Sequence, residues 1–309
     1  MTRPGRRPEL IVAGSIALDT LEGPFGAVTG ELGGSALYFS LAAGLIGPVR
    51  LLAPVGGDGV ELVRRAVAGR DVSLEGLAVL EAPTYRWQAR QLEGRNLDLG
   101  SHDSIYDAWQ PELPAGFSGW AFVGSMRPDL QVRVARGLAG ARLLAADAMR
   151  SYVAAQPEAA RELLRLSDWY FCNHEEFAAL GGQIRSPGGF RRSWGLDGLV
   201  VKAGPAGVTA YTEGGVLGVP ALLSRKVVDT TGAGDTLAGG MLARWLNLEG
   251  EAGGLEDAMV HGVACASLAI EQVGVRGIAA ATPETLAERV EEVWQCLRES
   301  RRSASSPET

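Results

Sequence analysis

Short apolar segments alternate with amphipathic or small-residue segments along most of the chain. The apolar segments have the length of buried strands, and the segments between them have helical length and periodicity. Strands that alternate with helices predict a doubly wound α/β fold, a mostly parallel sheet with helices on both faces. The expected strands are residues 9–18, 50–55, 119–125, 141–147, 168–173 and 197–204, and the expected helices include 35–46, 59–68, 234–246, 255–272 and 283–299.

One segment breaks this pattern. Residues 84–99, TYRWQARQLEGRNLDL, alternate aromatic, charged and polar side chains with a period of two. That period is typical of a half-exposed antiparallel ribbon, and residues near 18–32 can add a strand to it. We therefore expect a single α/β domain over residues 1–309, with a small β-sheet lid formed from about 18–32 and 84–106. Residues 300–309 are expected to form a disordered tail.

Composition narrows the classes of protein that remain. The 309 residues are 46% hydrophobic and 21% charged, which is enough apolar material for a large core. A net charge of −7 argues against nucleic acid as a main partner. The longest apolar run, 36–47, is too short to span a bilayer, and residues 1–8 lack the apolar centre of a signal peptide. We therefore expect no membrane partner.

The three cysteines give a further indication of location. Cys172, Cys265 and Cys296 are far apart and match neither a zinc-site spacing nor a disulfide framework. Reduced thiols and a cytoplasmic location fit this usage.

Several common catalytic motifs are absent from the sequence. It contains no G-x-x-x-x-G-K-[ST], no G-x-S-x-G and no H-E-x-x-H. The first strand is followed by AGSIALD and not by G-x-G-x-x-G, which argues against a dinucleotide-binding start.

The segment VVDTTGAGDTLAGG, residues 227–240, puts a glycine loop and a carboxylate at the start of a helix. Its first two valines are expected to end a strand. Glycines let a ligand approach the backbone closely, and a helix N-terminus attracts anions. The helix dipole should keep Asp235 ionised, so that it can take a proton from a hydroxyl that attacks a bound phosphoryl group. The alternative is a carboxylate that only stabilises the start of the helix.

Four segments together resemble the ribokinase-like (PfkB) family of carbohydrate and nucleoside kinases. DTTGAGDTLAGG looks like the C-terminal signature of that family, and LGGSALYFSLAAGLIG (32–47) is similar to its N-terminal Gly-Gly signature. NHEE (173–176) matches its N-x-x-E motif, and VVKAGPAG (200–207) resembles the strand and turn of its nucleotide site. The four occur in family order, and the resemblance covers roughly residues 10–299. It implies a ribokinase-like α/β domain with a β-sheet lid.

The resemblance also implies roles for the residues of the glycine loop. Asp235 would be the general base. The anion hole for the transferring phosphoryl group would be formed by Gly232, Ala233 and Gly234. Asp147 and Arg150, in ADAMR, resemble a family segment near the substrate and the phosphate.

A second group would bind the nucleotide. Asn173 and Glu176 would position Mg²⁺ and phosphate, with Glu176 acting on the metal through water. A helix N-cap with its capping-box partner is the alternative for this pair. Lys202 would point towards the phosphates, although a strand-end lysine can also be merely solvated. Gly204 and Gly207 would turn the chain beneath the phosphates.

A third group would bind the substrate. Asp19 would accept sugar hydroxyls, or would be only a turn residue, and Gly33 and Gly34 would let the substrate approach the backbone. Sugar kinases of the family often have Asn where this chain has Tyr38, which argues against plain ribose and favours other polyols, including inositol. Tyr38 could equally be a core residue. In the ribbon, Arg90, together with Arg86 and Trp87, could face the substrate or pack within the sheet.

The function implied is an ATP- and Mg²⁺-dependent kinase that transfers the γ-phosphoryl group to a hydroxyl of a small sugar or cyclitol. A monovalent cation is a further candidate cofactor, and a homodimer through the lid a further expectation. A nucleoside kinase and a non-catalytic sugar-binding homologue are the alternatives. Which substrate and which hydroxyl react stays open from sequence.

Overall fold

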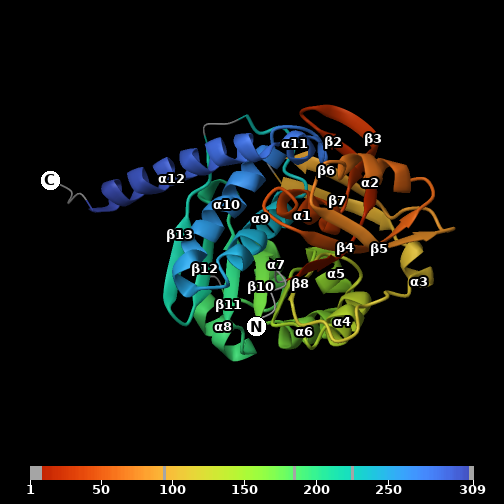
Figure 1. Cartoon of the computed structure of the whole chain (residues 1–309), viewed down its shortest axis with the longest axis horizontal. Coiled ribbons are helices and arrows are strands. Elements are labelled where there is room, and N and C mark those ends of the chain that lie inside the picture. The colour runs from red at the N-terminus through yellow and green to blue at the C-terminus, as the bar shows by residue number, and fades with distance from the viewer. Residues whose placement is uncertain (1–8, 93–94, 184–185, 224–225, 306–309) are drawn as a thin grey trace, which may run out of the picture.

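The apolar strands pair into one large sheet in the computed structural model, which describes residues 9–92, 95–183, 186–223 and 226–305 (Figure 1). Its order is β13-β12-β11-β10-β9-β8-β1-β4-β5. The strands are β1 (Leu10–Ala13), β4 (Val49–Gly56), β5 (Val72–Leu80), β8 (Trp120–Val123), β9 (Leu143–Ala146), β10 (Trp169–Asn173), β11 (Gly198–Lys202), β12 (Val208–Thr212) and β13 (Gly215–Val219). Neighbouring strands are parallel from β5 through β11, and β12 is antiparallel to both of its neighbours.

The chain reverses direction across the sheet at β1. It first adds β4 and β5 on one side of β1, and then returns to add β8 to β11 on the other. In open α/β sheets, ligands bind beyond the carboxyl ends of the strands at such a switch point. The fold therefore predicts a ligand site at the loops that follow β1, β8, β9, β10 and β11.

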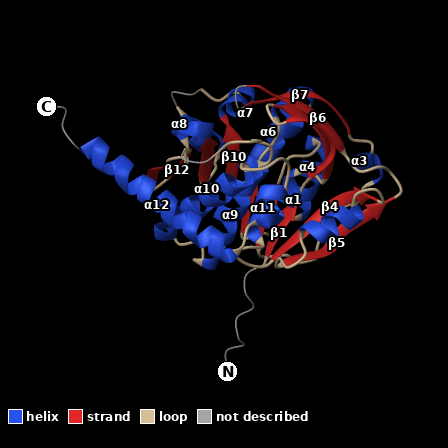
Figure 2. Cartoon of the chain, turned by 90° about the horizontal axis from the view of Figure 1, so that it is seen from above, coloured by secondary structure: helices blue, strands red, loops and turns tan. Residues whose placement is uncertain are grey.

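Helices cover both faces of this sheet. Alternate strand residues enter two separate cores, with Leu10 and Val12 in one and Ile11 and Ala13 in the other, as expected for strands buried on both sides. The first core is covered by α1 (Ser35–Ala43), α2 (Val60–Ala66), α9 (Ala233–Asn247), α10 (Leu255–Ala269), α11 (Arg276–Ala280) and α12 (Pro283–Ser305). The second is covered by α3 (Ile105–Ala108), α4 (Pro128–Gly137), α5 (Arg150–Ala155), α6 (Pro157–Leu166), α7 (His174–Ala179) and α8 (Pro187–Trp194). In Figure 2, α8 and α10 lie on opposite sides of β10 and β12.

A second, four-stranded sheet stands apart from the first, and we call it the lid sheet. Its order is β3-β2-β6-β7, with β2 (Ala17–Gly23), β3 (Gly26–Gly33), β6 (Arg86–Leu92) and β7 (Arg95–His102). The two outer pairs are antiparallel and the central pair, β2 with β6, is parallel. The doubly wound sheet and the small second sheet predicted from the sequence are both present. Glu93 and Gly94, in the expected lid segment, lie outside the described residues.

Four expectations about the elements differ from the structure. The single strand expected over 9–18 is divided, because β1 belongs to the large sheet and β2 to the lid sheet. The edge strand β5 was not expected, and residues 105 and 106, the end of the expected lid, belong to α3. The tail expected from residue 300 continues α12 as far as Ser305, with Arg301 paired to Glu256 of α10; residues 306–309, like 1–8, lie outside the described part.

Among the described residues, no helix is both long and apolar enough to cross a membrane.

Candidate active site

The carboxyl edge of the large sheet brings four ionisable side chains together near the start of α9: Asp147, Glu176, Lys202 and Asp235. Asp147 follows β9, Lys202 ends β11, and Asp235 lies in the first turn of α9. The Nζ atom of Lys202 lies 3.6 Å from Oδ2 of Asp147. Burial acts to lower the pKa of Lys202, but the carboxylates of Glu176, Asp147 and Asp235 outweigh it and raise that pKa. Lys202 is therefore a charged ammonium inside a cluster of acids.

The residue before α9 has to be glycine. Gly232 has a φ of 71°, in the left-handed region, and a Cβ there would clash with the ring of Tyr38. Two residues later, a Cβ on Gly234 would lie 2.7 Å from Nζ of Lys202. Gly232 thus leaves space for the Tyr38 ring, and Gly234 leaves space for the Lys202 ammonium at a helix N-terminus, an environment that attracts anions.

The loop that leads into α9 is irregular, so the strand end expected at Val227 and Val228 is wrong. The Val228 N–H donates to the carbonyl of Ile270 at 2.8 Å. Asp229 then fixes the loop, because its Oδ1 accepts from the Thr231 N–H and its Oδ2 from the Gly274 N–H, each at 2.9 Å. Such side-chain bonds replace the strand ladder that the sequence suggested.

The carboxyl groups of this cluster all have raised pKa values. Desolvation raises the pKa of Asp235 well above its usual value, Asp147 and Glu176 raise it further, and Lys202 lowers it. Desolvation and like charges therefore oppose the helix dipole that was expected to keep Asp235 ionised. Burial also raises the pKa of Asp147, and desolvation raises that of Glu176 to about 7.

Asn173 and Glu176 form the capping box given above as the alternative for this pair. Oδ1 of Asn173 accepts from the N–H groups of Glu175 and Glu176 at 2.9 Å each, and Oε2 of Glu176 accepts from the Asn173 N–H at 2.7 Å. Capping explains their spacing without a metal.

Glu176, together with Asp147, also suits magnesium. Oδ1 of Asp147 is buried and has no hydrogen-bond partner, and carboxylate oxygens are the ligands that Mg²⁺ prefers. Among the described residues, no group of three or more His, Cys, Asp or Glu side chains could hold a metal alone. Mg²⁺ in phosphoryl-transfer sites usually takes one or two carboxylates and completes its shell with water and phosphate. Asp147 and Glu176 fit that mode.

The other residues expected near the nucleotide lie around this cluster. Gly204 begins the short 3₁₀ turn η1 (Gly204–Ala206) directly after β11, and Gly207 ends it. Arg150 begins α5, and its Nη1 lies 3.1 Å from Oε2 of Glu175. Arg150 is therefore next to the capping box, where Glu175 neutralises it.

The expected substrate residues meet on the other side of Gly232. Asp19 of β2 is 3% exposed, and its Oδ1 has no hydrogen-bond partner. A Cβ on Gly33 would clash with Oδ2 of Asp19, and one on Gly34 would lie 2.5 Å from the Ser15 carbonyl oxygen. The Tyr38 ring is part of the core, yet its hydroxyl is buried without a partner. Burial raises the pKa of Tyr38, and so do the nearby carboxylates of Asp229, Asp19 and Asp235.

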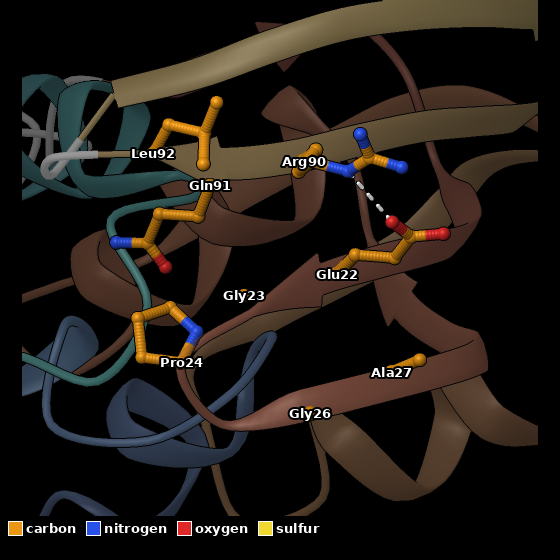
Figure 3. A pocket seen from close by; sticks show the side chains of 8 residues that line it. All are labelled: Glu22, Gly23, Pro24, Gly26, Ala27, Arg90, Gln91 and Leu92. Atoms are coloured by element: carbon orange, nitrogen blue, oxygen red, sulfur yellow. Dashed lines mark hydrogen bonds and ion pairs between the residues drawn. The ribbon is translucent and has the colours of Figure 1, made fainter.

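The structure does not bring Arg90 into this group. Its Nε lies 2.8 Å from Oε2 of Glu22, the residue opposite it on β2, and about half of the Arg90 side chain is exposed (Figure 3). The neighbours Ala89 and Gln91 are buried instead. Because strand side chains alternate between faces, Arg90 lies on the outer face of the lid sheet.

The remaining ribbon residues divide between the faces. Arg86 pairs with Asp58 at 2.7 Å, and the indole of Trp87 donates to Asp98 of β7 at 3.1 Å. Gln91 has a buried Oε1 without a partner. Sequence reasoning missed Gln91, which lies on the same face as Trp87 and could have been found from the two-residue period.

A family model described as pfkB family carbohydrate kinase matches residues 122–281, which is more than half of the chain. The matched segment includes Asp147, Asn173, Glu176, Lys202 and Asp235. The chain belongs to the pfkB family. The resemblance inferred from the four sequence motifs is thereby confirmed, and the protein is a kinase of the sugar and nucleoside class.

Two curated relatives are similar over most of the chain. An ATP-dependent ribose-1-phosphate kinase from Halopiger xanaduensis is 30% identical over 262 residues, which cover 79% of this chain and 82% of that protein. A cytidine kinase from Thermococcus kodakarensis is 26% identical over 247 residues, covering 76% of this chain and 87% of that protein.

Solved structures share the fold at lower identity. The nucleoside kinase of Methanocaldococcus jannaschii, described as an archaeal member of the ribokinase family, has a TM-score of 0.74 and 22% identity, covering 93% of this chain and 99% of its own. The aminoimidazole riboside kinase of Salmonella enterica has a TM-score of 0.73 and 20% identity, covering 91% and 99%. These similarities confirm the ribokinase-like fold predicted from the sequence.

Proposed function

We propose that this pfkB-family kinase transfers the γ-phosphoryl group of ATP to a hydroxyl of a small polyhydroxy acceptor, with Asp235 as the general base. The proposal rests on one arrangement of groups at the carboxyl edge of the large sheet. An ammonium, a glycine-lined helix N-terminus and a carboxylate lie together, next to a second set of buried polar groups that lack partners.

The groups without partners suit a hydroxylated acceptor. An unsatisfied buried polar group costs about 1–3 kcal/mol. Oδ1 of Asp19 and the hydroxyl of Tyr38 are two such groups. A polyol bound between them and Asp235 would satisfy both, and this gain would favour binding of the acceptor.

The chemistry follows from the same positions. Asp235 accepts the proton of the acceptor hydroxyl, whose oxygen attacks the γ-phosphorus while the bond to ADP breaks. Lys202 and the N–H groups at the start of α9 stabilise the charge on the transferring group. Mg²⁺, when bound, would neutralise charge on the nucleotide phosphates, and Asp147 and Glu176 are the residues that would hold it.

For the acceptor, we propose a ring polyol other than free ribose, either a cyclitol or a ribose substituted at C1. Where sugar kinases of the family often have an Asn, Tyr38 provides one O–H, and its ring offers a flat apolar surface to a substrate ring. The relatives support the second form, because cytidine and ribose 1-phosphate are both riboses with a substituent at C1.

ATP consumption with a panel of acceptors tests the proposal. Ribose, fructose, myo-inositol, cytidine and ribose 1-phosphate would be compared by kcat/KM, with Asp235→Asn as the inactive control. A tenfold lead for ribose would contradict the acceptor class. No consumption with any acceptor, together with tight binding of one of them, would favour the non-catalytic homologue.

We also propose that the lid sheet pairs with that of a second copy. Leu92, Leu97 and Leu99 of β6 and β7 are each about half exposed, at 51%, 49% and 49%, and exposed apolar groups of this kind favour association. The nearby pocket of about 420 Å³, lined by residues including Pro24 and Leu92, adds to this surface (Figure 3). Sedimentation should show a dimer that Leu97→Lys converts to a monomer; a monomeric wild-type protein would contradict this.

A further inference from the structure

The far end of the lid sheet touches the loop that carries the anion hole. Nδ2 of Asn96 donates to Oγ1 of Thr231 at 3.0 Å, although the two residues are 135 positions apart. Asn96 lies on β7 opposite Gln91, whereas the lid sheet joins the core near Ala17 and Tyr85. The contact is therefore remote from the attachment of the lid sheet.

Thr231 is a buried residue of that loop, next to the glycines at the start of α9. It is 8% exposed and directly precedes Gly232. Its N–H is already held by Asp229, which is anchored in turn to the Gly274 N–H. The core thus holds the backbone of Thr231, and the bond from Asn96 holds its side chain. The core and the lid sheet therefore both position the peptide that precedes Gly232.

A second contact of the lid sheet is weaker. Nη1 of Arg95 lies 3.5 Å from Oε1 of Glu175, beside the capping box. Four-fifths of the Arg95 side chain is exposed, and exposed ion pairs contribute little. Glu31 of β3 also forms an ion pair with Arg276, two residues after the Gly274 that anchors Asp229. Asn96 is the lid-sheet residue whose side chain bonds directly to Thr231.

We propose that Asn96 is a positioning residue for phosphoryl transfer. By holding the side chain of Thr231 from the lid sheet, it sets the Gly232–Gly234 backbone in the position that transfer needs. This inference rests on the proposed kinase function. It requires that loss of the bond lowers kcat and leaves the KM for ATP nearly unchanged.

A double-mutant cycle tests the contact. Asn96→Ala and Thr231→Val should each lower kcat about five- to tenfold, the effect of one hydrogen bond. The double variant should be no slower than either single one. Thr231→Ser keeps the hydroxyl and should retain kcat, and Gln88→Ala, on the exposed face of β6, is the matched control. Multiplying effects in the double variant would overturn the proposal.

Hydrogen exchange supplies a readout that needs no acceptor. In the ligand-free protein, Asn96→Ala should speed exchange of the amides of residues 229–232, and Gln88→Ala should not. Unchanged exchange in this loop would also overturn the proposal. Failure of the wild-type protein to phosphorylate any acceptor would count against the proposed function alone, because the exchange result is independent of it.

Discussion

Replacing Glu176 with Gln should stabilise the ligand-free protein at neutral and alkaline pH. Gln can keep the capping box, because its Oε1 can accept from the Asn173 N–H as the carboxylate does. What it removes is a charge in an unfavourable place. Desolvation, the largest cause, and the charge of Asp147 raise the pKa of Glu176 from 4.5 to about 7.

The size of the effect follows from that shift. One pKa unit corresponds to about 1.4 kcal/mol, so ionising Glu176 in the folded state costs up to about 3 kcal/mol relative to the unfolded chain. The side chain is only partly buried, so we expect about 2 kcal/mol. The cost is absent below pH 4.5, where both states are protonated, grows between pH 4.5 and 7, and is complete above pH 7.

Urea unfolding from pH 4.5 to 8, with a chelator and without nucleotide, measures this. The difference in the free energy of unfolding between Glu176→Gln and the wild type should be near zero at the acid end and reach about 2 kcal/mol above pH 7. The neighbouring variant Glu175→Gln, at an exposed position, is the control and should stay within about 0.5 kcal/mol. A difference that does not depend on pH would show that the cap, and not the charge, decides the outcome.

Three further predictions concern the reaction. Asp235→Asn should lower kcat about 10²–10⁴-fold, the usual cost of losing a general base, while ATP binding measured by calorimetry persists; near-normal kcat would refute its role. Lys202→Met should move the acid limb of the kcat–pH profile to higher pH, because Lys202 lowers the pKa of Asp235; an unmoved limb would show that Asp235 does not respond to it. Tyr38→Phe removes a hydroxyl without a protein partner, so the protein should keep its stability while the acceptor KM rises about tenfold. An unchanged KM would mean that the acceptor does not reach Tyr38.

The strands of the large sheet could be predicted where their apolar character is continuous. β10 and β11 are buried along most of their length, so their sequences indicate a strand without knowledge of the neighbours. β5 was missed because it is an edge strand, half exposed, with Gly76 at its centre. The division of residues 9–18 between β1 and β2 was also hidden, because an apolar run indicates burial and does not say in which sheet.

Within the site, the local patterns could be read and the distant contacts could not. Gly232 beside Asp235, and Asn173 with Glu176, lie within one turn of chain, so their spacing determines their geometry. Whether Arg90 faces the substrate or packs within the sheet stayed open from the sequence, because the orientation of a ribbon depends on pairing and on bulges, such as that between Gln88 and Ala89. Asn96 has no local signal, since its partner is far away in the chain.

The composite origin of the lid sheet affects how the protein folds during synthesis. β2 and β3 emerge early. β6, which pairs with the other edge of β2, is made only after α1, β4, α2 and β5. Until then the β2–β3 hairpin is isolated and only marginally stable, and one edge of β2 is unpaired. Leu21, which is buried in the finished fold, is exposed to water during that interval. A nascent chain paused before Arg86 should therefore bind holdase chaperones through residues 17–33, and release them once β6 and β7 have left the ribosome.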